Sequence, residues 1–84
     1  MKWTVYILKS YNHPKTYVGS SNNLTRRLDE HNSSIGSGTV YTSRYKPWKV
    51  VYTEEFDNEE LARKRERYYK SSAGRRKIKN HIPL

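Results

Sequence analysis

The sequence predicts a small α+β domain, in which a three-stranded antiparallel sheet is flanked by helices in the order β-β-α-β-α-α. Three observations favour this class. Segments 2–8 and 16–19 are rich in β-branched and aromatic residues and are joined by a short turn. Segment 48–56 has the same character, and helix-start signals precede two other segments. Strands joined by a tight turn are antiparallel, and a third strand after a helix can join their sheet.

The first two strands form a predicted hairpin around "SYNHPK", where Asn12 and Pro14 favour a turn. A turn centred near Asn12 pairs residues whose numbers sum to about 23–25. An odd sum places Tyr6 and Tyr17 on one face of the hairpin, directly or diagonally opposed. Their phenols then share one patch. The alternative is a pair of ordinary strand tyrosines that pack across the hairpin.

A helix is predicted within "SSNNLTRRLDEHN". Asn22 or Asn23 can cap it, and Leu24 and Leu28 supply an apolar seam. The following segment, 33–47, is interrupted by glycine, serine and proline and predicts a loop.

Two side chains of this helix flank the seam. At about 100° per residue, Arg27 and His31 lie beside the leucines that face the sheet, whereas Arg26 faces water. Arg27 can therefore reach the tyrosine patch. Alternatively, its stem packs at the edge of the core while its charged head stays solvated.

The third strand, Trp48–Phe56, leads into the best-signalled helix, predicted over 58–70. Asp57 is the expected N-cap, and Glu60 completes a capping-box pattern. The predicted buried stripe of this helix consists of Leu61, Ala62, Tyr68 and Tyr69. Phe56 and Leu61 occupy the positions of a hydrophobic staple.

Glu66 lies at the border of that stripe, four residues after Ala62 and four before Lys70. It can face a site, or it can form a surface ion pair with Lys70. Arg65 falls in the middle of the stripe, which the pattern does not explain. Gly74 is the expected stop signal, and "RRKIKNHI" predicts a short final helix.

Composition limits the class of protein. The 84 residues predict one domain, 1–84, and the lack of cysteine excludes disulfides, thiolate zinc sites and cysteine catalysis. No apolar run approaches about 20 residues, and no signal peptide is visible, so we expect a cytoplasmic protein without membrane contact.

The net charge of +9 favours a polyanionic partner, with nucleic acid the commonest in that compartment. The basic side chains expected to grip its backbone are Lys70, Arg75, Arg76, Lys77 and Arg44. The alternative is a well-solvated helix surface. Beside Arg44, Tyr41 and Tyr45 can stack on an unpaired base or tuck into the domain edge.

"VYI" at 5–7, "YVG" at 17–19, "NLTRRLDEHN" and "ELARKRERYYKS" together resemble the GIY-YIG nuclease family. The resemblance is to its small stand-alone bacterial members, which are related to the N-terminal nuclease module of the bacterial excinuclease. It covers nearly the whole chain and depends on the order and spacing of the motifs. Val5 departs from the pattern, because it stands where the family's name-giving glycine would be.

The resemblance implies a metal-dependent endonuclease that hydrolyses phosphodiester bonds in DNA, with one Mg²⁺ or Mn²⁺ held by Glu66. It implies that Arg27 binds the scissile phosphate, and that Tyr6 acts as general base or positions the water with Tyr17 or His31 assisting. Structure-specific cleavage in repair or recombination, with a possible protein partner, would follow. The alternatives are a non-catalytic nucleic-acid-binding module of the same fold and an interaction domain.

A tyrosine base raises a difficulty, because an unperturbed phenol has a pKa of about 10. Arg27, the metal and the basic C-terminal segment are expected to lower the pKa of that phenol. His31, expected to titrate near neutrality, could accept the phenol proton. The sequence leaves open which of Tyr6 and Tyr17 is the base.

Overall fold

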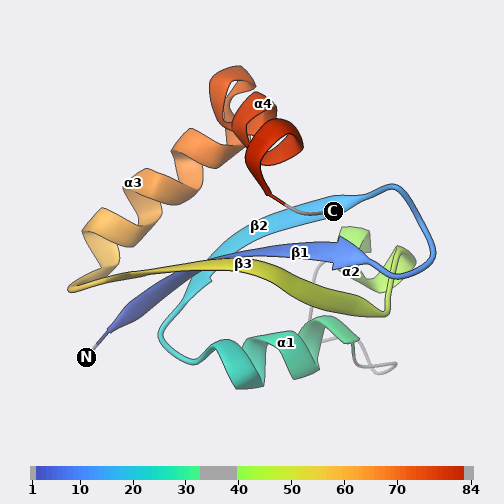
Figure 1. Cartoon of the computed structure of the whole chain (residues 1–84). Coiled ribbons are helices and arrows are strands. Elements are labelled where there is room, and N and C mark those ends of the chain that lie inside the picture. The colour runs from blue at the N-terminus through green and yellow to red at the C-terminus, as the bar shows by residue number, and fades with distance from the viewer. Residues whose placement is uncertain (1, 33–39, 83–84) are drawn as a thin grey trace.

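The structure, a computed structural model, describes residues 2–32 and 40–82. Its elements occur in the expected order, with one added short helix: β1 Trp3–Ser10, β2 Thr16–Ser21, α1 Leu24–Asn32, α2 Val40–Arg44, β3 Trp48–Phe56, α3 Glu59–Lys70 and α4 Ser72–His81. Figure 1 shows α3 and α4 on one side of the sheet and α1 on the other. The α+β class and the flanked antiparallel sheet are confirmed.

The sheet has the order β2-β1-β3, with both neighbours antiparallel to β1, so β2 lies at an edge. Tyr6 pairs with Gly19 and Leu8 pairs with Tyr17, so the paired numbers of β1 and β2 sum to 25. This register confirms the expected placement: the two tyrosines share one face and are diagonal neighbours.

Each face of the sheet packs against its own helices. On the α3 and α4 side, Val5, Ile7 and Val18 pack with buried residues of the helices, Ala62, Tyr69 and Ile78 among them. On the α1 side, Tyr6, Leu8 and Trp48 form a second cluster against which Tyr17, Leu24 and Leu28 pack. The alternation of side chains along each strand therefore decides which helices a residue can reach.

Several local expectations were wrong. Asn58, and not Asp57, caps α3 by accepting a hydrogen bond from the Leu61 backbone N–H at 2.9 Å, while Asp57 pairs with Lys2. Leu61 is 43% exposed and so does not belong to the buried stripe. Within the segment expected to be a loop, 40–44 form α2, and residues 33–39 lie outside the described part.

The end of α3 also differs from expectation. The helix ends before Ser71, whose hydroxyl accepts from the Gly74 N–H and caps α4. Gly74 is buried in the first turn of α4, where a Cβ would lie 2.0 Å from the Tyr68 carbonyl oxygen. The glycine thus permits close contact between the two helices instead of stopping one.

The structure explains Arg65. Its Nε donates to Glu54 on β3 at 3.0 Å, and its guanidinium lies over the rings of Tyr68 and Tyr69 at 4.6 and 4.8 Å. The charge of Arg65 is therefore accommodated within the buried stripe of α3 by an ion pair with Glu54 and by stacking on two tyrosine rings. In 2–32 and 40–82, no helix combines the length and apolar character that a membrane crossing requires.

Candidate active site

The predicted site begins at the Tyr6 hydroxyl, which is buried on the α1 side of β1. It lies 3.1 Å from Nε2 of His31, a side chain of α1 that is only 1% exposed. The Tyr17 ring lies 4.9 Å from the His31 ring. The two tyrosines share one face of the hairpin, and α1 places His31 against that face. Three predicted site residues, Tyr6, Tyr17 and His31, are thus in contact.

Gly19 makes room for this arrangement. It pairs with Tyr6 across the hairpin, and a Cβ at this position would lie 2.5 Å from the Tyr6 hydroxyl oxygen. The phenol consequently lies directly against the β2 backbone. The glycine of "YVG" therefore positions a predicted catalytic group, a role that the pairing sum near 25 could have indicated.

Arg27 is placed by the seam of α1. Its side chain is 31% exposed, against 65% for Arg26, in agreement with the orientation expected from helix geometry. Its Nη1 donates to Glu30 at 2.8 Å, and this ion pair raises the pKa of Arg27. The guanidinium stays charged. Its charge and its hydrogen bonding to the Tyr6 hydroxyl both act to lower the pKa of that hydroxyl.

The electrostatics contradict two expectations. Burial raises the pKa of Tyr6 to about 12, which outweighs the lowering effect of Arg27. Burial, assisted by the Arg27 charge, lowers the pKa of His31 to about 4. Both groups are therefore uncharged at pH 7, and the free protein contains neither a phenolate nor a histidine that titrates near neutrality at this site.

A neutral imidazole carries its proton on one ring nitrogen, so the tautomer of His31 decides which partner donates in the hydrogen bond between Nε2 and the Tyr6 hydroxyl. The other ring nitrogen, Nδ1, is buried and has no hydrogen-bond partner among the described residues.

Glu66 belongs to the opposite side of the sheet. Its Oε1 accepts from the Ser20 hydroxyl at 2.6 Å and its Oε2 from Lys70 at 2.7 Å, and its side chain is only 20% exposed. Ser20 faces α3 because it is three residues from Tyr17 on the same strand. The same alternation could have identified Ser20, which the sequence reasoning missed.

The two sides meet at the β2 edge. The Lys70 ammonium that binds Glu66 also lies 5.9 Å from the centre of the Tyr17 ring. The charge of Glu66 is close enough to Tyr6 to raise the pKa of its hydroxyl. Four of the five predicted catalytic side chains therefore lie together on the α1 side of the sheet, and Glu66 lies on the α3 side, where Lys70 links it to the Tyr17 ring.

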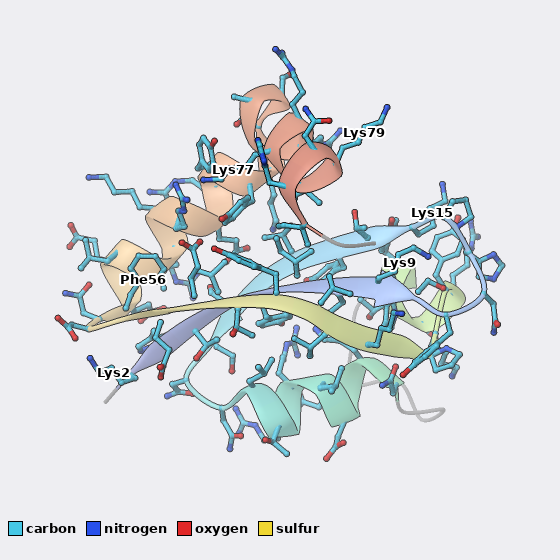
Figure 2. All side chains as sticks on the ribbon, in the orientation of Figure 1. Lys2, Lys9, Lys15, Phe56, Lys77 and Lys79 are labelled. Carbon is cyan, nitrogen blue, oxygen red and sulfur yellow. The ribbon has the colours of Figure 1, made fainter. Side chains whose placement is uncertain are left out.

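The predicted nucleic-acid ligands are more dispersed. Lys70 and Arg75 line a cleft of about 570 Å³ beside β2. Arg76 is exposed on α4 and Arg44 on α2, and neither lines that cleft. Lys77, labelled in Figure 2, belongs to α4 and does not line that cleft either.

A family model described as the GIY-YIG catalytic domain matches residues 2–79. This chain belongs to the GIY-YIG family. A UPF0213 protein of Clostridium perfringens is 40% identical over 74 residues, which are 88% of this chain and 76% of that relative. The solution NMR structure of a UPF0213 protein from Bacillus halodurans superimposes with a TM-score of 0.54 at 30% identity, covering 94% of this chain and 81% of that one.

A second group of relatives is much longer. The structure-specific endonuclease subunit SLX1 of Chaetomium globosum is 46% identical over 52 residues, which are 58% of this chain but 16% of that protein. This chain therefore matches a small part of that subunit. The small bacterial relatives confirm the kind of family member that the sequence resembles, and the family is one of nucleases.

Proposed function

We propose that this GIY-YIG domain is a divalent-metal-dependent endonuclease that hydrolyses phosphodiester bonds in DNA. The observation that carries the proposal is the placement of three groups beside the edge strand β2: a phenol and a guanidinium on its α1 side, and a largely buried carboxylate on its α3 side. Phosphodiester hydrolysis requires an oriented water, an anion-binding group and a stabilised leaving oxygen. These residue types match those requirements.

The carboxylate environment fits a hard divalent cation. Among the described residues, no three His, Asp or Glu side chains lie together as a metal cage. Mg²⁺ commonly uses one or two carboxylates and completes its sphere with phosphate oxygens and water. Glu66 would hold Mg²⁺ or Mn²⁺, with the Ser20 hydroxyl orienting its carboxylate. A bound divalent cation supplies Lewis acidity and lowers the pKa of water.

The residues of the chain supply orientation. Arg27, held by Glu30, presents a charged fork to a phosphate. Tyr6, hydrogen-bonded to neutral His31, orients the attacking water without becoming a phenolate. A proton transfer from Tyr6 to His31 in the free protein is opposed by the difference between pKa values of about 12 and about 4. Tyr17 packs against His31 and completes the wall of the site.

Plasmid nicking with Mg²⁺, with Mn²⁺ or with EDTA tests the proposal. The wild type should nick only with a metal, and Glu66→Gln and Arg27→Ala should reduce nicking at least about 100-fold, the scale of a lost electrostatic contact. Matched controls are Glu60→Gln, exposed on the same helix, and Arg26→Ala. Metal-dependent nicking that survives both site variants would refute the site assignment. A repair role and a protein partner stay predictions.

A further inference from the structure

The cleft beside β2 contains residues that phosphodiester cleavage does not use. It is lined by Pro14, Lys15, Thr16, Tyr17, Val18, Tyr41, Tyr69, Lys70, Arg75 and Ile78. Its volume of about 570 Å³ falls within the range of about 300–1,000 Å³ that is typical of small-ligand sites. It opens along the edge strand next to the candidate active site, because Tyr17 belongs to both.

Tyr41 forms the aromatic wall of this cleft. Its hydroxyl donates to the Thr16 carbonyl at 3.1 Å, and its ring stacks on buried Trp48, with centroids 5.9 Å apart and an interplanar angle of 26°. It nevertheless remains 40% exposed. The ring is thus fixed in position while part of it faces solvent.

The charges that line the cleft are all positive. Lys15 approaches from the hairpin, and Lys70 and Arg75 approach from α3 and α4, with no acidic residue among the lining side chains. Arg75 and Tyr41 line the same cleft. Burial and the neighbouring Tyr45 raise the pKa of Tyr41, and the charge of Arg75 opposes this. An aromatic wall opposite cations suits a planar, negatively charged ligand.

The distribution of charge over the whole domain favours the same ligand. Five of the eight acidic residues lie within 54–60, where β3 turns into α3. Figure 2 shows Phe56 and Lys2 at that end of the sheet, and Lys9 and Lys15 at the other. A polyanion at the active site is therefore drawn toward the hairpin and the cleft.

We infer that the cleft binds one unpaired nucleotide of a DNA strand, next to the scissile phosphate, with its base on Tyr41 and its phosphates on Lys15 and Arg75. This inference rests on the proposed function and narrows its substrate class to DNA with an unpaired segment. In a continuous duplex the base faces are stacked on one another, so a tyrosine ring cannot reach them. Only an unpaired base offers a face to the ring.

The test measures binding in EDTA, so that it does not depend on cleavage. The probes are a fluorescein-labelled 20-nucleotide oligo-dT, the same strand with one abasic position, and a blunt 20-base-pair duplex, read by fluorescence polarisation. The variants are Tyr41→Leu, Tyr41→Phe and, as matched control, Tyr11→Leu, since Tyr11 is 61% exposed and does not line the cleft.

The wild type should bind oligo-dT more tightly than duplex. Tyr41→Leu should weaken oligo-dT binding by about 5- to 100-fold, the range for one lost stacked base, and duplex binding less than about twofold. Tyr41→Phe, which keeps the ring, should bind like the wild type, and so should Tyr11→Leu. Arg75→Gln should reduce the slope of log affinity against log salt by about one.

Equal losses on oligo-dT and duplex, or no loss, in a Tyr41→Leu variant with unchanged circular dichroism would overturn the inference. So would a wild type that prefers duplex. Plasmid nicking without any preference for oligo-dT would refute the nucleotide site alone. A preference that depends on Tyr41, without nicking in either metal, would refute the proposed activity alone.

Discussion

Acidification should destabilise this protein through His31. The imidazole is buried and its pKa falls to about 4, whereas in the unfolded chain it is 6.5. Between these values the unfolded state binds a proton that the folded state does not, so stability falls as the pH is lowered through this window. The full difference is worth about 3 kcal/mol, and about 2 kcal/mol of it should be lost between pH 7 and pH 5.

The assay is urea unfolding followed by tryptophan fluorescence at pH 7, 6 and 5. His31→Gln removes the titrating group and should flatten the dependence of unfolding free energy on pH, whatever it does to stability at pH 7. His81→Gln, at an exposed position on α4, is the matched control and should keep the wild-type dependence. A wild type that loses less than about 0.5 kcal/mol between pH 7 and 5, or a His31→Gln variant with the wild-type slope, would refute the burial argument.

Three further substitutions test how the site and its support are built. Ser20→Ala should raise the metal concentration for half-maximal nicking by about 10- to 100-fold, because Glu66 loses its hydroxyl partner; an unchanged metal requirement would contradict this. Gly19→Ala should displace the Tyr6 hydroxyl and lower nicking at least about tenfold, while wild-type rates would show that the close approach is dispensable. Gly74→Ala should force α3 and α4 apart and lower the free energy of unfolding by about 1–3 kcal/mol, an effect that an unchanged urea midpoint would exclude.

The parts of the fold that sequence could predict are those set by local periodicity. The hairpin register follows from one turn, and with it the shared face of Tyr6 and Tyr17. The seam of α1 distinguishes Arg27 from Arg26 through helix geometry alone. Such features depend on neighbours in the chain, so the spacing of the residues determines them.

The features that escaped prediction depend on contacts between distant segments. Asp57 has the sequence of a cap but is engaged by Lys2, 55 residues away, and Asn58 takes its place. Gly74 has the sequence of a helix stop, yet its lack of a side chain serves the contact between α3 and α4. The expected pKa values of the site residues were wrong for the same reason: burial raises the pKa of Tyr6 more than the Arg27 charge lowers it, and burial and the Arg27 charge together lower the pKa of His31.

The position of β2 at the sheet edge explains how one site can draw on both layers of helices. Tyr17 and Ser20 point to opposite faces because they are three residues apart on the strand. In a central strand such side chains would be separated by the flanking strands, and a ligand could contact only one of them. At the edge, the Lys70 ammonium that binds the Glu66 carboxylate of one layer also lies 5.9 Å from the centre of the Tyr17 ring of the other layer. The strand order, more than any single motif, therefore places side chains from both layers beside one strand, as the proposed site requires.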